Sequence, residues 1–193
     1  LILAVFFPLR TGLAAQAIHT AVKAGQFGRL TFLSARVKWW RTPEYYSSSS
    51  WRGTWTGDGG GALMNQGIHA IDLLQWLGGR VSAISAHAAT LSHSELEVED
   101  ALAACLRFEN GALGTIEAST CCYPGLEFSL EVSGDKGTAV LVNDQIEFWQ
   151  FSEKTGKPTG GGRTVGGTSD PRAISSEGHR LQILEFCKAI RGE

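Results

Sequence analysis

VEDALAACLRFENGALGTIEASTC, residues 98–121, decides the fold class, because it holds two strand patterns separated by a turn signal. The strand patterns are Val98–Phe108 and Leu113–Cys121. Glu109-Asn110-Gly111 lies between them, and Asn-Gly favours the tight turn of a β-hairpin. Strands joined in this way run antiparallel. The segment therefore predicts an antiparallel hairpin.

The same kind of pattern continues on both sides of this hairpin. A second turn signal is Gly134-Asp135-Lys136-Gly137. Further strands are predicted over Ile2–Phe7 (a buried strand), Arg29–Trp40, Val81–Leu91, Glu127–Ser133, Thr138–Val142 and Ile146–Phe151. Helices are predicted over Leu13–Ala24, Gly59–Leu77 and Ser175–Arg191, whereas Lys154–Asp170 is rich in Gly, Thr and Ser and predicts a mobile excursion. We therefore predict an α+β domain with its helices packed on one face of an antiparallel sheet.

Composition and charge exclude several classes of protein. The chain has 193 residues, enough for one domain with a sizeable core, and a net charge of -2. Its 17 Lys and Arg residues are scattered, so neither nucleic acid nor an anionic membrane is an expected partner. The apolar opening Leu1–Phe7 is too short to span a bilayer and has no signal-peptide flanks.

The cysteines and glycines exclude two kinds of site. Four cysteines occur without CxxC spacing, which indicates reduced thiols in a cytoplasmic protein rather than a metal site or a disulfide framework. No GxGxxG follows a predicted strand, so the fingerprint of dinucleotide binding is absent.

A line of polar residues runs along the predicted helix Gly59–Leu77. At about 100° per residue, Asn65, His69, Asp72 and Trp76 fall within about 60° of one another. Apolar residues occupy most of the remaining circumference, which is typical of a buried helix. Buried polar groups are costly unless they bond to each other or to a ligand.

Two interpretations of this line remain open. In one, Asp72 bonds His69 in a purely structural network. In the other, a carboxylate steers an imidazole that acts as a general base. Metal binding has less support, because no second His or Cys lies nearby.

The segment Arg41–Asp58 is crowded with aromatic and charged residues. Trp, Tyr, Arg and Glu alternate there without helix or strand periodicity. These residues could fill a core, but the interleaved Arg41 and Arg52 favour ligand binding. Aromatic faces stack on sugar rings, and guanidinium groups bind anions in a bidentate manner.

Together these motifs resemble the C-terminal domain of the Gfo/Idh/MocA family of NAD(P)-dependent oxidoreductases. The motifs are Phe7–Arg10, Trp39–Tyr46, Trp51–Trp55, Gly59–Gln75, Val98–Asp100, Phe108–Ala112, Gly134–Thr138 and His179–Ile190. They span nearly the whole chain and are weakest over Lys154–Asp170. The resemblance implies that residues 1–193 form a single C-terminal domain with an open, mostly antiparallel sheet, used for substrate binding and subunit contact. The family's N-terminal Rossmann domain is then absent from this chain.

The resemblance also implies roles for particular residues. His69 would take the proton from a substrate hydroxyl, Asn65 would bind that hydroxyl or orient the site, and Asp72 would steer His69. Many family members have Asp at the position of Asn65. The substrate-binding residues implied by the aromatic loop, the first motif and the last helix are Arg10, Trp40, Arg41, Tyr46, Arg52 and His179.

The expected function is that of a sugar oxidoreductase domain that uses NAD or NADP. The family's Glu-Lys-Pro motif lies in the Rossmann domain, so the cofactor would be bound mainly outside this chain and the isolated chain would be inactive. The Trp-Trp-Arg loop is similar to that of dehydrogenases acting on nucleotide-linked amino-sugar acids. A domain of an NAD-dependent glycosidase and a non-catalytic assembly or sensing module are the alternatives. Homo-oligomerisation is expected through the uncovered sheet face, which should be apolar.

Overall fold

An open sheet of seven strands forms the centre of the molecule, in the order β2-β3-β4-β1-β5-β6-β7. The computed structural model describes residues 2–153, 156–158 and 176–192. The strands are β1 Leu30–Lys38, β2 Val81–Ala89, β3 Ala101–Phe108, β4 Leu113–Ser119, β5 Ser129–Gly134, β6 Gly137–Val142 and β7 Gln145–Phe151. β1 runs parallel to β4, and every other neighbouring pair is antiparallel. The predicted fold class is confirmed.

The hairpin predicted from residues 98–121 is β3–β4. Its strands pair from Ala101 opposite Ser119 to Arg107 opposite Leu113. Gly111 has a φ of 88°, a left-handed conformation that glycine adopts without steric cost. The Asn-Gly signal therefore marks the turn for the physical reason that predicted it.

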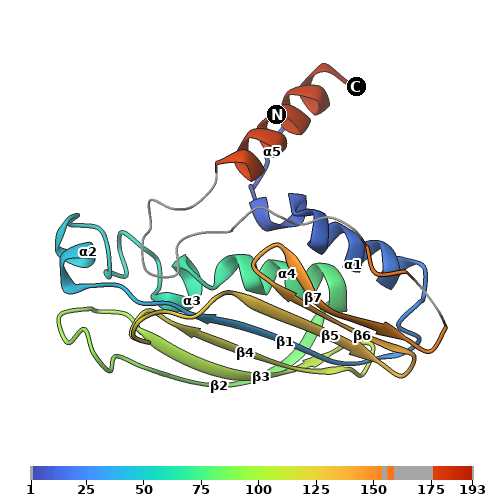
Figure 1. Cartoon of the computed structure of the whole chain (residues 1–193). Helices are drawn as coiled ribbons and strands as arrows, with labels where there is room; N and C mark the ends of the chain where they lie inside the picture. Colours follow the sequence, from blue (N-terminus) through green and yellow to red (C-terminus); the bar gives the residue numbers. More distant parts are fainter. Residues whose placement is uncertain (1, 154–155, 159–175, 193) are drawn as a thin grey trace.

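The helices lie on one side of the sheet, as Figure 1 shows. They are the 3₁₀ helix η1 Pro8–Thr11 and α1 Leu13–Lys23, α2 Pro43–Ser47, α3 Ala62–Asn65, α4 Ile68–Gly78 and α5 Glu177–Arg191. α1 and α4 pack on the sheet, and Ile18, Leu73, Leu33 and Leu130 are buried in the core between them. α5 contacts η1 and stands apart from the sheet (Figure 1).

The helix predicted over Gly59–Leu77 begins later and is broken into α3 and α4. The backbone N–H of Gly67 donates to the carbonyl of Ala62 at 2.8 Å, a wider turn than an α-helical one. A Cβ on Gly67 would lie only 2.8 Å from the carbonyl oxygen of Leu63, so the break needs glycine. Asn65 therefore does not share one continuous helix with His69.

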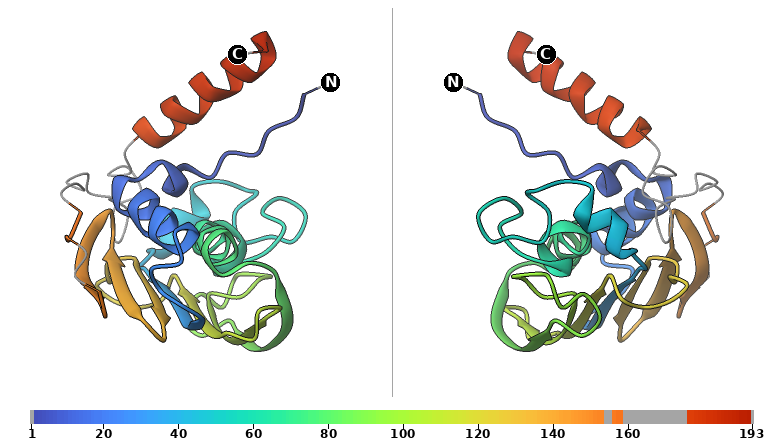
Figure 2. Two further views of the ribbon diagram at one scale, coloured as in Figure 1. Left: turned by 90° about the vertical axis from the view of Figure 1, so that its right-hand side faces the viewer. Right: turned by 90° about the vertical axis from the view of Figure 1, so that its left-hand side faces the viewer.

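The prediction of a buried strand over Ile2–Phe7 is wrong. The segment is an extended chain outside any described strand, and 87% of Leu3 is exposed. Figure 2 shows it running outward on the same side as α5, and Phe6 contacts the ring edge of Phe186 in that helix. Its residues therefore pair with no strand of the described sheet. The predicted excursion Lys154–Asp170 lies outside the described residues, except for residues 156–158.

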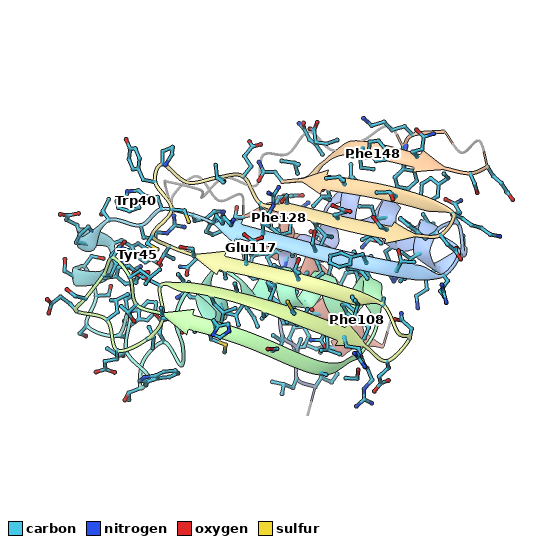
Figure 3. All side chains as sticks on the ribbon, turned by 90° about the horizontal axis from the view of Figure 1, so that it is seen from below. Trp40, Tyr45, Phe108, Glu117, Phe128 and Phe148 are labelled. Carbon is cyan, nitrogen blue, oxygen red and sulfur yellow. The ribbon has the colours of Figure 1, made fainter. Side chains whose placement is uncertain are left out.

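The sheet face opposite the helices is mixed rather than apolar, which corrects the expectation. Figure 3 views this face, with Glu117 and Phe148 on it. Glu117 forms an ion pair with Lys38 there. Phe32 and Leu113 lie opposite each other in the β1–β4 register and are 38% and 48% exposed. The face therefore carries apolar residues among charged and small ones.

Candidate active site

A cavity of about 370 Å³ lies on the helix side of the sheet. Its walls come from η1, the start of α1, the end of β1, the α3–α4 break and the first turn of α5. The predicted site residues that line it are Asn65, His69, Arg41 and His179. The fold thus brings together residues that are far apart in the sequence. The cavity is of the size that small-molecule sites have in proteins.

His69 lies at the first turn of α4 and is largely buried. Its Nδ1 atom is buried and makes no hydrogen bond to a described residue. Burial lowers the pKa of His69 and nearby His179 lowers it further, while the charge of Asp72 acts in the opposite direction. The imidazole is therefore kept neutral near pH 7, as a proton acceptor must be.

Asp72 is buried on α4 and is bound by Arg10. Its two oxygens accept from Nε and a terminal nitrogen of Arg10 at 2.7 and 2.5 Å, which is a bidentate ion pair. The guanidinium also lies 5.4 Å from the ring centroid of Trp76. Asp72 therefore acts on His69 through its charge, while Arg10 orients the carboxylate. Arg10 is not among the described residues that line the cavity.

Asn65 lines the cavity but already has two protein partners. Its Nδ2 donates to Asp58 at 2.7 Å, and its Oδ1 accepts from Gln66 at 3.1 Å. The α3–α4 break places this side chain beside His69 without a continuous helix between them. The amide is thus held in a fixed orientation at the cavity wall.

The aromatic loop contributes Arg41 to the cavity wall, and Figure 3 shows its Trp40 and Tyr45 at one end of the sheet. The side chain of Tyr46 turns away to bond Thr120 Oγ1 at 2.7 Å, and burial raises the pKa of Tyr46 to about 12. Arg52 bonds the carbonyl of Tyr45 at 3.0 Å. Trp40, Tyr46 and Arg52 do not line the cavity among the described residues. They support the loop that carries Arg41.

The cavity wall also includes Trp39 and Tyr45 of the aromatic cluster, which were not among the predicted site residues, and Gln66 and Asn143, which sequence reasoning missed. Trp39 Nε1 and Asn143 Oδ1 are buried and have no hydrogen-bond partner among the described residues. Asn143 lies at the β6–β7 turn with a φ of 53°, a conformation that asparagine tolerates. The turn is visible as a gap between two strand patterns, but its position beside the cavity depends on the folded sheet.

No cluster of His, Cys, Asp and Glu in the described part of the chain could hold a metal ion. No described helix is both long and apolar enough to cross a membrane.

Comparison with known proteins then assigns the family. The model of the GFO/IDH/MocA C-terminal domain matches residues 15–140. The chain belongs to the Gfo/Idh/MocA family. An uncharacterized oxidoreductase, YrbE of Bacillus subtilis (strain 168), is 34% identical over 90 residues, which are 45% of this chain and 26% of YrbE.

Solved structures of dehydrogenases resemble a larger share of the chain. The WlbA dehydrogenase of Bordetella pertussis, in complex with NADH and UDP-GlcNAcA, is 39% identical with a TM-score of 0.72, over 76% of this chain and 45% of WlbA. The WlbA dehydrogenase of Chromobacterium violaceum, in complex with NADH and UDP-GlcNAcA, is 37% identical with a TM-score of 0.74, over 78% of this chain and 44% of that protein. Levoglucosan dehydrogenase, in complex with NADH and levoglucosan, is 26% identical with a TM-score of 0.65, over 70% of this chain and 39% of that protein. The chain spans less than half the length of these structures.

Proposed function

We propose that residues 1–193 are the substrate-binding domain of an NAD(P)-dependent dehydrogenase that oxidises a hydroxyl of a sugar derivative. The observation that supports this most is the desolvated imidazole of His69, which lines a ligand-sized cavity with an unpartnered ring nitrogen. The favoured substrates are sugar nucleotides that carry a carboxylate, because WlbA was solved with UDP-GlcNAcA. The cysteines are free, which suits the cytoplasmic setting that we propose.

The cofactor does not fit this chain alone. The sequence has no GxGxxG after a strand, and the connection between the parallel strands β1 and β4 contains the strands β2 and β3 as well as helices, unlike a dinucleotide-binding βαβ crossover. We therefore place the NAD(P) site mainly in a domain outside these residues, where the cofactor would supply hydride chemistry. The part of this chain is to bind the sugar and to receive the proton of its hydroxyl.

The geometry supports separate roles for the residues in and around the cavity. Neutral His69 accepts the hydroxyl proton, and the charge of Asp72 stabilises the imidazolium that forms. Arg10 holds Asp72 by its bidentate bonds. Asn65, fixed by Asp58, orients the substrate hydroxyl, and Arg41 and His179 bind the rest of the sugar derivative.

The first test measures NADH formation with UDP-GlcNAcA. The isolated chain is expected to form none, and a titration of it with NADH should show no micromolar binding. In the protein that carries this chain with its dinucleotide-binding part, His69→Gln should lower kcat by about 10²–10⁴-fold, the usual contribution of a general base. Full kcat in that variant would overturn the role of His69. Micromolar binding of NADH by the isolated chain would overturn the division between domains.

A further inference from the structure

The side chain of Tyr45 lines the cavity and is partly exposed, whereas that of its neighbour Tyr46 does not line it. Both residues lie on the short helix α2, and successive residues of a helix point about 100° apart. Tyr46 uses its hydroxyl in the bond to Thr120 Oγ1. Of these two tyrosines, Tyr45 is therefore the one that a ligand in the cavity can reach.

A chain of hydrogen bonds that begins at Asp58 fixes which groups donate and which accept along the cavity wall. The carboxylate oxygen Oδ1 of Asp58 can only accept, so the Asn65 atom that lies 2.7 Å from it is the amide nitrogen. The side-chain oxygen of Asn65 then faces Gln66, whose amide nitrogen donates to it at 3.1 Å. Asp58 thus determines the orientation of both amides.

The hydroxyl of Tyr45 is the last group in this chain. The same amide nitrogen of Gln66 lies 3.5 Å from the phenol oxygen, and an amide nitrogen can only donate. The phenol oxygen is therefore the acceptor in this long bond, which leaves its own proton unused. No described residue accepts that proton. Since Asn65 and Gln66 both line the cavity, the unused O–H group lies at the cavity wall.

The ring of Tyr45 is held by its neighbours in the aromatic loop. The guanidinium carbons of Arg52 and Arg41 lie 4.3 and 5.3 Å from its centroid, and the ring of Tyr46 packs edge-on at 5.1 Å. A terminal nitrogen of Arg52 also donates to the carbonyl of Tyr45 at 3.0 Å and to Ser48 Oγ at 2.6 Å. Arg52 thus contacts both the ring and the backbone of Tyr45. A side chain that is already ordered loses less entropy when it binds a ligand.

We infer that Tyr45 binds the substrate by donating its phenol proton to a sugar oxygen beside the hydroxyl that His69 deprotonates, and that Arg52 is the positioning residue for Tyr45. The inference rests on the proposed function, because the ligand is the sugar derivative of that site. In that proposal Asn65 orients the reacting hydroxyl, and Gln66 joins the amide of Asn65 to the Tyr45 hydroxyl. A neighbouring hydroxyl or carbonyl oxygen of the same sugar is the acceptor that fits. Tyr45 keeps its proton, so its part is binding and not proton transfer.

Tyr45→Phe tests the binding role in the protein that carries this chain with its dinucleotide-binding part, assayed for NADH formation from UDP-GlcNAcA. The variant keeps the ring and loses only the hydroxyl. KM should rise roughly three- to tenfold, the effect of losing one hydrogen bond, while kcat should change by less than about twofold, because the bond is present in both the ground state and the transition state. Tyr123→Phe is the matched control: Tyr123 is 81% exposed and does not line the cavity, so neither constant should change.

The outcomes separate this inference from the proposed function. An unchanged KM in Tyr45→Phe would overturn the inference and leave the proposed function standing. A loss in kcat as large as the rise in KM would assign Tyr45 to the chemical step and overturn a pure binding role. If the unaltered protein forms no NADH from UDP-GlcNAcA, the proposed substrate class fails and the inference fails with it.

Arg52→Lys tests the positioning role, since lysine keeps the charge but lacks the planar guanidinium that contacts the ring and the carbonyl of Tyr45. In the unaltered protein this substitution should raise KM about as much as Tyr45→Phe does. In the Tyr45→Phe background it should raise KM little further, because no hydroxyl is left to misplace. Fully additive effects of the two substitutions on KM would overturn the role of Arg52 as a positioning residue for Tyr45.

Discussion

The imidazole of His69 should titrate below the ordinary histidine pKa of 6.5, because burial and the neighbouring His179 disfavour its charged form. The midpoint of its ring-proton shift in an NMR pH titration measures this directly. Between the lowered pKa and 6.5, the unfolded chain binds more protons than the folded one. The free energy of unfolding should therefore rise with pH across that window, and a midpoint above 6.5 would contradict the desolvated site.

The ion pair of Arg10 and Asp72 makes a second prediction at the scale of the residue. Arg10→Ala leaves a buried carboxylate without its partner, so the free energy of unfolding in urea should fall by about 2 kcal/mol, less than for a fully buried pair because Arg10 is partly exposed. The surface pair Arg80–Glu109 is the matched control, and Arg80→Ala should cost less than about 1 kcal/mol. Equal losses of unfolding free energy in the two variants would show that burial does not make the Arg10–Asp72 pair contribute more than a surface pair.

The sequence predicted which polar residues gather at α4, but not which partners they have. Helical spacing predicted that His69 and Asp72 share one side of the helix. In the structure His69 lines the cavity, and Asp72 is bound by Arg10. Arg10 is separated from Asp72 by 62 positions, so no local pattern could pair them. The buried atoms of Trp39 and Asn143 that lack a hydrogen-bond partner among the described residues could not be predicted either, because burial depends on the assembled sheet.

At the scale of the element, the start of α3 depends on Glu99. Its carboxylate accepts from the backbone N–H groups of Gly61 and Leu63, each at 3.0 Å, and its own carbonyl accepts from Ala62 at 2.9 Å. These are N–H groups that a helix leaves without partners at its first turn. A carboxylate there also matches the positive end of the backbone dipoles.

Gly61→Ala tests this arrangement. The added Cβ would lie 1.8 Å from the carbonyl oxygen of Glu99, so α3 or the segment before β3 must move. We expect the free energy of unfolding to fall by about 1–3 kcal/mol, the usual cost of overpacking. Gly156→Ala, which has open space around it, should have almost no effect. A Gly61→Ala variant as stable as the unaltered chain would mean that Glu99 does not fix α3.

Secondary-structure elements were predicted well where the local sequence determines them. Alternation and the two turn signals located β3 to β7, since hairpins are built from neighbours in the sequence. The break between α3 and α4 was missed because apolar residues with helical spacing lie on both sides of Gln66 and Gly67. The apolar run Ile2–Phe7 was predicted to be a strand, but a strand needs an adjacent strand, and the described chain offers none.

For the whole molecule, the uncovered sheet face predicts self-association. Phe32 and Leu113 lie side by side there and are substantially exposed, and the Lys38–Glu117 pair lies on the same face toward the other end of β1. Apolar residues with charges around them are typical of contacts between subunits. We expect sedimentation of the chain to show oligomers, and the double variant Phe32→Asp and Leu113→Asp to be monomeric.

Leu91→Asp provides the control for this prediction. Leu91 is also exposed but lies in the loop after β2, off the sheet face. Its variant should keep the oligomeric state of the unaltered chain. A monomer at high concentration before any substitution would contradict the role of the sheet face. The sequence predicted that one face would be free but not its mixed character, which appears only once the strand register sets which side chains share it.

The central position of β1 has a consequence for the order of events during synthesis. Of the strands of this sheet, β1 is the first to leave the ribosome, yet its two neighbours, β4 and β5, begin at Leu113 and Ser129. Until then both of its edges lack hydrogen-bond partners, which exposes the nascent chain to mispairing. The groups β2-β3-β4 and β5-β6-β7 can each form from adjacent segments, and β1 joins them last. Such long-range closure slows folding, so nascent chains stalled before residue 113 should depend on chaperones.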